Sequence, residues 1–337
     1  MHDARGACSQ ADALFSLASF ASLLKRQPRL ASLDEDAKSG DFKLMSRVCL
    51  SDALTGNTAL WRYMALDKFI DLLSTSHLFF SPLASYAKTD PFEGFLPAVC
   101  LKADAEISKG LSAETPAIIE ILRKLCADPG QAAARSAFEK FDAAFEDLKT
   151  GRKRFFPAIM QSIAVSCWHQ NSCESEAMWR LYAENGKAVA IETTADALRS
   201  AIESRASEHR IHIHPVKYVD FFDDMLLPQD CVVGGHRAPL LKRRSYEHEH
   251  EVRAFICRPT PENPREMLNL DYWRPTAVKL PVDVALLVKR VYVSPYQSEP
   301  FESSVRTICE VFGLGTEIIE TSRLLSGQED LVNMLAF

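Results

Sequence analysis

Short runs rich in branched and aromatic residues recur along this chain, separated by helical patterns and by turns. Branched and aromatic side chains favour strands, so each run predicts a strand. The predicted strands are Leu60–Met64, Leu78–Ser81, Ile163–Trp168, Lys187–Glu192, Val216–Asp220, Val278–Leu280 and Val288–Val293. Because strands and helices follow in a mixed order without a repeat, the pattern predicts an α+β fold with a mixed, mainly antiparallel sheet and helical decorations.

Helical spacing of apolar residues marks the other regular segments. Helices are predicted over Lys68–Ser74, Glu176–Glu184, Ala195–Ser204 and Phe301–Phe312. A single α+β domain then covers residues 59–325, with a helical insertion at about 112–150. A helical lead-in, residues 1–58, precedes this domain, and a tail, residues 326–337, follows it.

Charge and cysteine content limit the partners of the chain. The net charge of -6 and the pI near 5.9 argue against a dedicated surface for duplex nucleic acid. The cysteines are scattered and form no Cys-x-x-Cys pair, which is typical of reduced thiols in a cytoplasmic protein. The apolar run Ala13–Leu24 is too short to span a bilayer and lacks the basic head of a signal peptide, so no membrane partner is expected.

The densest group of ionisable residues lies in the segment Arg244–Ile256. If the whole segment is a strand, Glu247, Glu249, Glu251 and Arg253 share one face. Crowded carboxylates repel one another, which raises the pKa of at least one of them and suits a general acid or base. The alternative is a solvated edge strand whose charges discourage aggregation.

Two pairs of histidines, His212 with His214 and His248 with His250, are each spaced to share a strand face. Two such pairs on neighbouring strands could make a four-ligand metal site. No His-Glu-x-x-His or Cys-spaced motif accompanies them, and histidines on strands are more often surface residues. The sequence therefore predicts no metal.

Nucleophilic catalysis by Ser166 or Cys167 is a further alternative, because His169 follows closely after the same predicted strand. Closeness in sequence does not by itself give a hydrogen-bonded dyad. The chain has no Gly-x-Ser-x-Gly elbow, no Walker lysine loop and no Gly-x-Gly-x-x-Gly fingerprint. The usual signals of these hydrolase, NTPase and dehydrogenase classes are therefore absent from the sequence.

Two acids and two aromatic residues are also site candidates. Asp90 and Glu93 fall on a Pro- and Gly-interrupted loop beside a strand end, where acids often serve a site. An Asp before a proline more commonly forms a turn. Trp179 and Tyr182 lie at helical spacing, which favours packing in the core over stacking on a base.

A series of short motifs runs through most of the chain: Leu60-Trp-Arg-Tyr, Leu78-Phe-Phe-Ser-Pro, Asp90-Pro-Phe-Glu, Val165-Ser-Cys-Trp, Met178-Trp-Arg-Leu-Tyr-Ala, Lys187-Ala-Val-Ala-Ile, Tyr246 to Arg253, Leu286 to Pro295, and Ser322-Arg-Leu324. The series resembles the bacterial family called domain of unknown function 2971 over roughly residues 60 to 325. This resemblance implies no established activity.

The chain also resembles the ADP-ribosyltransferase fold, which uses an Arg or His on an early strand, a Ser or Tyr on a middle strand and a late Glu. Arg62, Ser166 and Glu249 or Glu251 occur in that order. The resemblance implies an NAD-consuming enzyme, such as a toxin or defence effector, with a small-molecule nucleotide as substrate and an unidentified macromolecular acceptor. It implies Glu251 as the catalytic carboxylate, Glu249 as the group that orients the acceptor, and Arg62, Ser166 and Tyr63 as NAD-binding residues.

Two other functions fit the same residues. The first is a hydrolase or nuclease that uses the clustered acids and the nearby histidines. The second is a non-catalytic binding module, in which Arg62, Glu251 and Arg253 form a structural ion-pair cluster between strands.

Overall fold

Most of the predicted strands lie side by side in one 10-stranded sheet. The computed structural model describes residues 47–106, 109, 157–183, 186–205, 207–259, 269–322, 324–325 and 328–334. Across the sheet the strands follow the order β1 (Val48–Leu50), β6 (Ile211–Pro215), β9 (Glu251–Ile256), β4 (Ala164–Gln170), β2 (Ala59–Ala65), β5 (Ala188–Thr194), β11 (Arg290–Val293) and β12 (Ile319–Thr321). Two further strands, β3 (His77–Pro82) and β10 (Val278–Pro281), join the sheet through β4.

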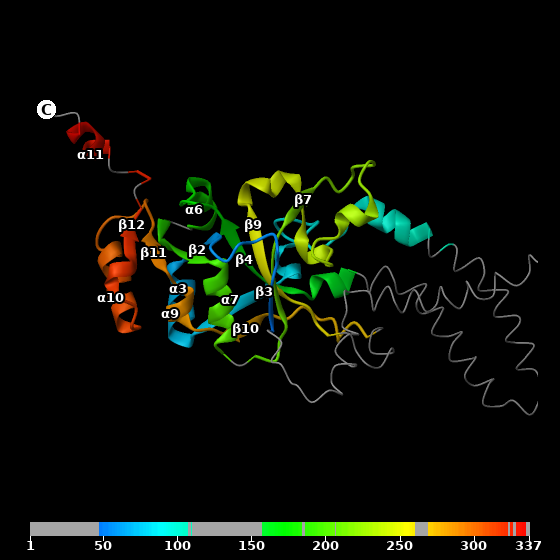
Figure 1. Cartoon of the computed structure of the whole chain (residues 1–337), viewed down its shortest axis with the longest axis horizontal. Helices are drawn as coiled ribbons and strands as arrows, with labels where there is room; N and C mark the ends of the chain where they lie inside the picture. The colour runs from blue at the N-terminus through cyan, green and yellow to red at the C-terminus, as the bar shows by residue number, and fades with distance from the viewer. Residues whose placement is uncertain are drawn as a thin grey trace, which may run out of the picture.

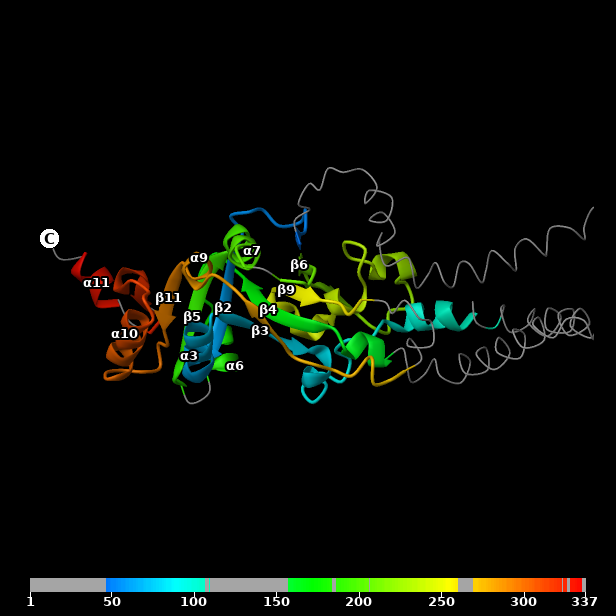
Figure 2. The ribbon, with the colours of Figure 1, turned by 90° about the horizontal axis from the view of Figure 1, so that it is seen from below.

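The pairing of these strands is mainly antiparallel, as the sequence predicts. In this sheet only the end pairs β1–β6 and β11–β12 run parallel among the described residues. A separate two-stranded sheet consists of the short parallel strands β7 (Lys217–Val219) and β8 (Leu241–Arg243). Figure 2 shows the succession of β11, β5, β2, β4 and β9 across the sheet.

Alternation along β2 explains the two layers that cover the sheet. Leu60 and Met64 belong to the large core, which is shared with the helices α3 (Leu66–Thr75), α7 (Ala195–Glu203), α9 (Val284–Leu287) and α10 (Phe301–Val311). Trp61 and Tyr63 point to the opposite face and pack against helix α6 (Glu176–Tyr182). Because successive side chains of a strand alternate, α6 covers the face opposite α3 (Figure 1).

The prediction of one long strand over Arg244–Ile256 is wrong in its first half. Arg244–Glu249 form the 3₁₀ turn η5, and His250 has a left-handed conformation with φ of 38°. The strand β9 begins only at Glu251, so Glu247, Glu249 and Glu251 do not share a strand face. The edge-strand alternative is also wrong, because β9 lies between β6 and β4 and all of its residues are buried.

The sheet includes short strands outside the predicted set. Val48–Leu50 in β1 lie within the predicted lead-in, and β12 is a similarly short strand near the C-terminal end. Strands of this length carry too few residues to show a period in the sequence. The predicted helical insertion at 112–150 lies outside the described residues, as does the lead-in up to residue 46.

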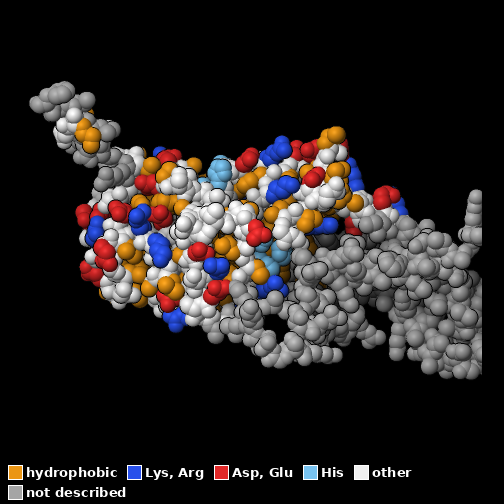
Figure 3. Space-filling model, viewed as in Figure 1, with side chains coloured by type: hydrophobic (Ala, Val, Ile, Leu, Met, Phe, Trp, Pro, Cys, Tyr) orange, Lys and Arg blue, Asp and Glu red, His pale blue; other side chains and the backbone are white. Residues whose placement is uncertain are grey.

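Two surface properties bear on the expected partners. Within the described ranges, no helix combines the length and the apolar character needed to cross a bilayer. On the face seen in Figure 3, Lys and Arg side chains are interspersed with Asp and Glu side chains.

Candidate functional site

A buried group of charged side chains surrounds the start of β9; we call Glu93, Lys242, Glu249, Glu251 and Arg253 the ion cluster. Arg253 holds Glu251 with two hydrogen bonds, Nε to Oε1 at 2.8 Å and Nη2 to Oε2 at 3.0 Å. Lys242 Nζ donates to Oε2 of both Glu249, at 2.6 Å, and Glu251, at 3.0 Å. Glu93 closes the group, because its Oε1 accepts from Arg253 Nη1 at 2.7 Å.

The loop that carries Glu93 is fixed by a second ion pair. Arg243 Nη2 donates to Asp90 Oδ1 at 2.7 Å, and the same oxygen accepts from the backbone N–H of Phe92 at 3.0 Å. This second hydrogen bond, from the backbone two residues on to the Asp side chain, forms the kind of turn that an Asp before proline favours. Asp90 therefore fixes the loop that brings Glu93 into the ion cluster, and both acids are buried.

Burial and charge give the two neighbouring glutamates different properties. Although burial raises the pKa of Glu251, Arg253 and Lys242 lower it to about 2. Burial raises the pKa of Glu249, and Lys242 offsets only part of that rise. The ion cluster has three carboxylates and two cations, so repulsion from Glu251 adds to the rise at Glu249. Glu249 is also the more open of the two, with a side chain that is 12% exposed against 4% for Glu251.

Arg62 and Ser166 form a direct contact on the neighbouring strands β2 and β4. Arg62 Nη1 donates to Ser166 Oγ at 2.7 Å, and Nη2 donates to the carbonyl oxygen of Phe79 on β3 at 3.4 Å. Strand β2 pairs with β4 only through Leu60 and Trp61, after which β3 takes its place beside β4. The Arg62 guanidinium therefore lies where β2 and β4 separate.

The sheet divides these predicted site residues into two groups. Ser166 lies opposite Ala254 of β9, whereas its neighbour Cys167 lies opposite Arg253. Since adjacent residues of a strand point to opposite faces, Glu251 and Arg253 project from the face opposite Ser166. The ion-pair alternative is accordingly correct for Glu251 and Arg253, while the hydrogen-bond partners of Arg62 are Ser166 and Phe79.

Tyr182, at the end of α6, lies within electrostatic range of both groups. Burial raises the pKa of its hydroxyl, and the Glu249 carboxylate raises it further. Burial lowers the pKa of Arg62, and Tyr182 is among the groups that partly offset this effect. Tyr182 remains 42% exposed, so it is not the core residue that its helical spacing favours.

Tyr63 and Trp179 have structural roles in their surroundings. The Tyr63 hydroxyl accepts from the backbone N–H of Ser175, the N-cap of α6, at 2.7 Å. Trp179 packs edge-on against Tyr63 with ring centroids 5.0 Å apart, and its Nε1 donates to Glu174. Trp179 is thus a core residue, as its helical position favours, and Tyr63 positions α6.

Cys167 is not paired with His169 as a nucleophile would require. Its Sγ lies 3.8 Å from the Tyr86 hydroxyl, and burial and the Glu251 carboxylate raise its pKa, which keeps the thiol protonated. His169 instead places Nδ1 2.6 Å from the carbonyl oxygen of Glu249.

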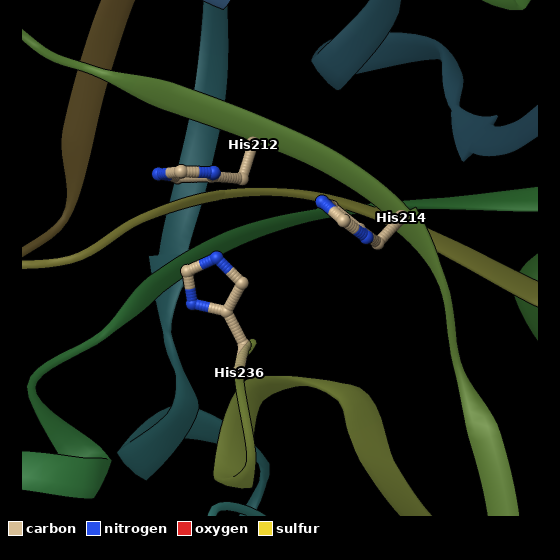
Figure 4. Close-up of side chains that lie close together, drawn as sticks. All are labelled: His212, His214 and His236. Carbon is tan, nitrogen blue, oxygen red and sulfur yellow. The ribbon is translucent and has the colours of Figure 1, made fainter. Parts of the chain in front are cut away.

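A second polar group lies on the face of the sheet that carries Arg253. It consists of three histidines, His212, His214 and His236, which we call the histidine triad. His212 and His214 share a face of β6, as predicted, and His236 approaches them from a turn (Figure 4). One ring nitrogen from each residue lies within 4.8 Å of the others. His248 lies in η5 and His250 follows it, so neither is on a strand, and the alternative of two histidine pairs on neighbouring strands is wrong.

Sequence reasoning missed Lys242 and His236 as members of these groups. A signal for Lys242 was the basic run that precedes the acidic segment, since a buried carboxylate needs a cation. His236 follows Gly234-Gly235, a dipeptide that often forms a tight hairpin.

Comparison of this chain with protein-family models, with curated proteins and with solved structures finds no match.

Proposed function

We propose that this protein binds NAD and breaks the bond between its nicotinamide and ribose, transferring ADP-ribose to an acceptor. The observation that carries the proposal is the hydrogen bond of 2.7 Å from Arg62 Nη1 to Ser166 Oγ, which holds the guanidinium where β2 and β4 separate. The guanidinium suits a phosphate, and the Glu249 carboxylate suits ribose hydroxyls and a developing positive charge.

The proposed reaction develops a positive charge on the ribose, which determines the role of the carboxylate and of the guanidinium. As the C–N bond breaks, its electron pair leaves with nicotinamide and the ribose carbon becomes an oxocarbenium ion. A carboxylate stabilises that cation and accepts a hydrogen bond from a ribose hydroxyl, while a guanidinium holds a phosphate. The acceptor nucleophile then bonds to the ribose carbon and loses its proton.

Geometry supports a different division of labour between the glutamates from the one that the resemblance implies. Both oxygens of Glu251 are already bound by Arg253 and Lys242, so we assign it a positioning role. Glu249 is more open and has a raised pKa, which suits the carboxylate that meets the substrate. In the proposal Arg62 holds NAD and Ser166 orients Arg62.

The test is release of nicotinamide from NAD by the purified full-length chain in the presence of cell lysate, which supplies acceptors. Glu249→Gln should lower the rate at least about 100-fold, the lower end of what a catalytic carboxylate contributes. Glu247→Gln is the matched control, because the same change falls on an exposed residue of the same turn. It should leave the rate unchanged.

Arg62→Lys provides a second readout of the same site. Lysine keeps the charge but loses the paired donors, so KM for NAD should rise more than kcat falls. Nicotinamide release that does not exceed the buffer background with wild-type protein, or that is equal in wild type and Glu249→Gln, would contradict the proposal.

A further inference from the structure

The histidine triad is built from two rigid pieces of backbone. His212 and His214 lie on β6, which is paired with β1 on one side and with β9 on the other. His236 ends a tight turn that begins at Val233. The two residues are joined by two backbone hydrogen bonds, of 2.7 and 2.8 Å. The two residues between them, Gly234 and Gly235, have φ of 52° and 83°, as a tight two-residue turn requires.

The turn is fitted closely to the histidine beneath it. A Cβ on Gly234 would lie 2.3 Å from Cε1 of His214, so only glycine allows this approach. The rings of His212 and His236 have centroids 4.5 Å apart, and those of His214 and His236 are 5.7 Å apart. In Figure 4 the three rings face a common space.

One polar atom of the triad is buried without a partner. His214 is 7% exposed, and its Nδ1 has no hydrogen-bond partner among the described residues. A buried polar atom without a partner destabilises the folded protein, so such atoms generally have a ligand, a water or an ion beside them. A packing role for the three imidazoles would leave this atom unexplained.

We propose that the histidine triad binds a divalent transition-metal ion, with zinc as the best-matched metal. Three imidazole nitrogens and one open position make a well-known zinc donor set. Zinc–nitrogen bonds of about 2.0–2.1 Å in a tetrahedron separate the nitrogens by roughly 3.3 Å. The nitrogens of the triad lie within 4.8 Å of one another, so each pair is at most roughly 1.5 Å wider than that spacing.

The position of the triad in the sheet places it next to the ion cluster. His214 lies opposite Arg253 across β6 and β9, so the metal would be a neighbour of the ion cluster on the same face of the sheet. This site is separate from Ser166 and its partner Arg62, because Ser166 lies on the other face of the sheet.

The test measures metal binding directly and requires no enzymatic activity. The full-length chain is stripped with a chelator, incubated with zinc alone, freed of excess metal and analysed for bound zinc. Wild type should retain about one zinc per chain, and His236→Asn should lose it. His248→Asn is the matched control, since it makes the same change at an exposed histidine outside the triad, and it should bind zinc like wild type.

Cobalt in place of zinc adds a geometric readout. Tetrahedral coordination by the triad predicts intense visible absorption, which His236→Asn should abolish without changing the far-UV circular dichroism. His212→Gln provides an independent loss of a ligand should His236→Asn misfold. The proposal is overturned if wild type retains no zinc, or if folded His236→Asn and His212→Gln retain as much as wild type.

Discussion

At the scale of single residues, the main distinction lies between Glu251, which is saturated by cations, and Glu249, which is less tightly held. Glu251 receives hydrogen bonds from Arg253 and Lys242 on its side chain, and its backbone N–H donates to the Tyr218 hydroxyl. The two glutamates are separated by one residue, and the left-handed backbone of His250 places both within reach of Lys242.

Glu251→Gln should destabilise the protein by roughly 3 kcal/mol, because removal of one partner leaves the buried charge of Arg253 and Lys242 poorly compensated. Glu247→Gln should change the free energy of unfolding by less than about 0.5 kcal/mol, as an exposed substitution does. Urea denaturation of both variants at neutral pH measures the difference. Equal stability of the two would mean that the ion cluster contributes nothing to folding.

Acidification should remove the stabilisation contributed by Glu251. Its pKa falls from the ordinary value of 4.5 to about 2 in the folded protein, so the folded state prefers the ionised form. This contribution is fully present above pH 4.5 and is lost as the pH falls toward 2. Glu249, whose pKa is raised on folding, has the opposite sign and opposes this loss.

The difference in unfolding free energy between wild type and Glu251→Gln should therefore shrink steadily below pH 4.5. Urea denaturation at a series of pH values from 7 to 3 provides the comparison. A constant difference over that range would show that Glu251 keeps an ordinary pKa.

At the scale of elements, the sequence predicts what is long and periodic and misses what depends on tertiary contacts. β2, β4 and β5 each have seven residues with a clear apolar pattern, and all three were predicted. Arg244–Glu249 was predicted as part of a strand, yet it forms a turn, after which Lys242 pairs with both Glu249 and Glu251.

The site residues follow the same rule. Glu251 and Arg253, two residues apart on one strand, were predicted to share a face, and they do. Arg62 and Ser166 are 104 positions apart, and only their order in the sequence suggested that they belong together. The sequence did not reveal that Glu251 lies on the face of the sheet opposite Ser166, because that depends on the pairing of β4 with β9. Whether they serve NAD stays a prediction.

Gly234→Ala should destabilise the protein by about 2–3 kcal/mol, through an unfavourable positive φ and overpacking against His214. Gly313→Ala is the matched control, because Gly313 has a φ of 76° but a Cβ there would meet no atom within 4 Å. That variant should lose only about 1 kcal/mol, from backbone strain. Thermal and urea unfolding measure both, and equal losses would indicate that the turn does not press on His214.

At the scale of the whole molecule, one core extends beneath most of the sheet. Residues of β6 at one side and of α10 at the other belong to the same buried cluster, together with Trp168 of β4. Figure 1 shows α10 at one end of the sheet and β9, the neighbour of β6, toward the other. A continuous core predicts that the described domain unfolds in one cooperative step.

Two core truncations test this cooperativity from opposite sides. Ile213→Ala in β6 should cost about 2–5 kcal/mol, and Val305→Ala in α10 should cost somewhat less, because both side chains are fully buried and each change leaves a cavity. In each variant, far-UV circular dichroism and tryptophan fluorescence should report the same unfolding midpoint. If Val305→Ala produces an early transition in circular dichroism while the fluorescence midpoint stays at its wild-type value, the α10 end folds independently of the β6 end.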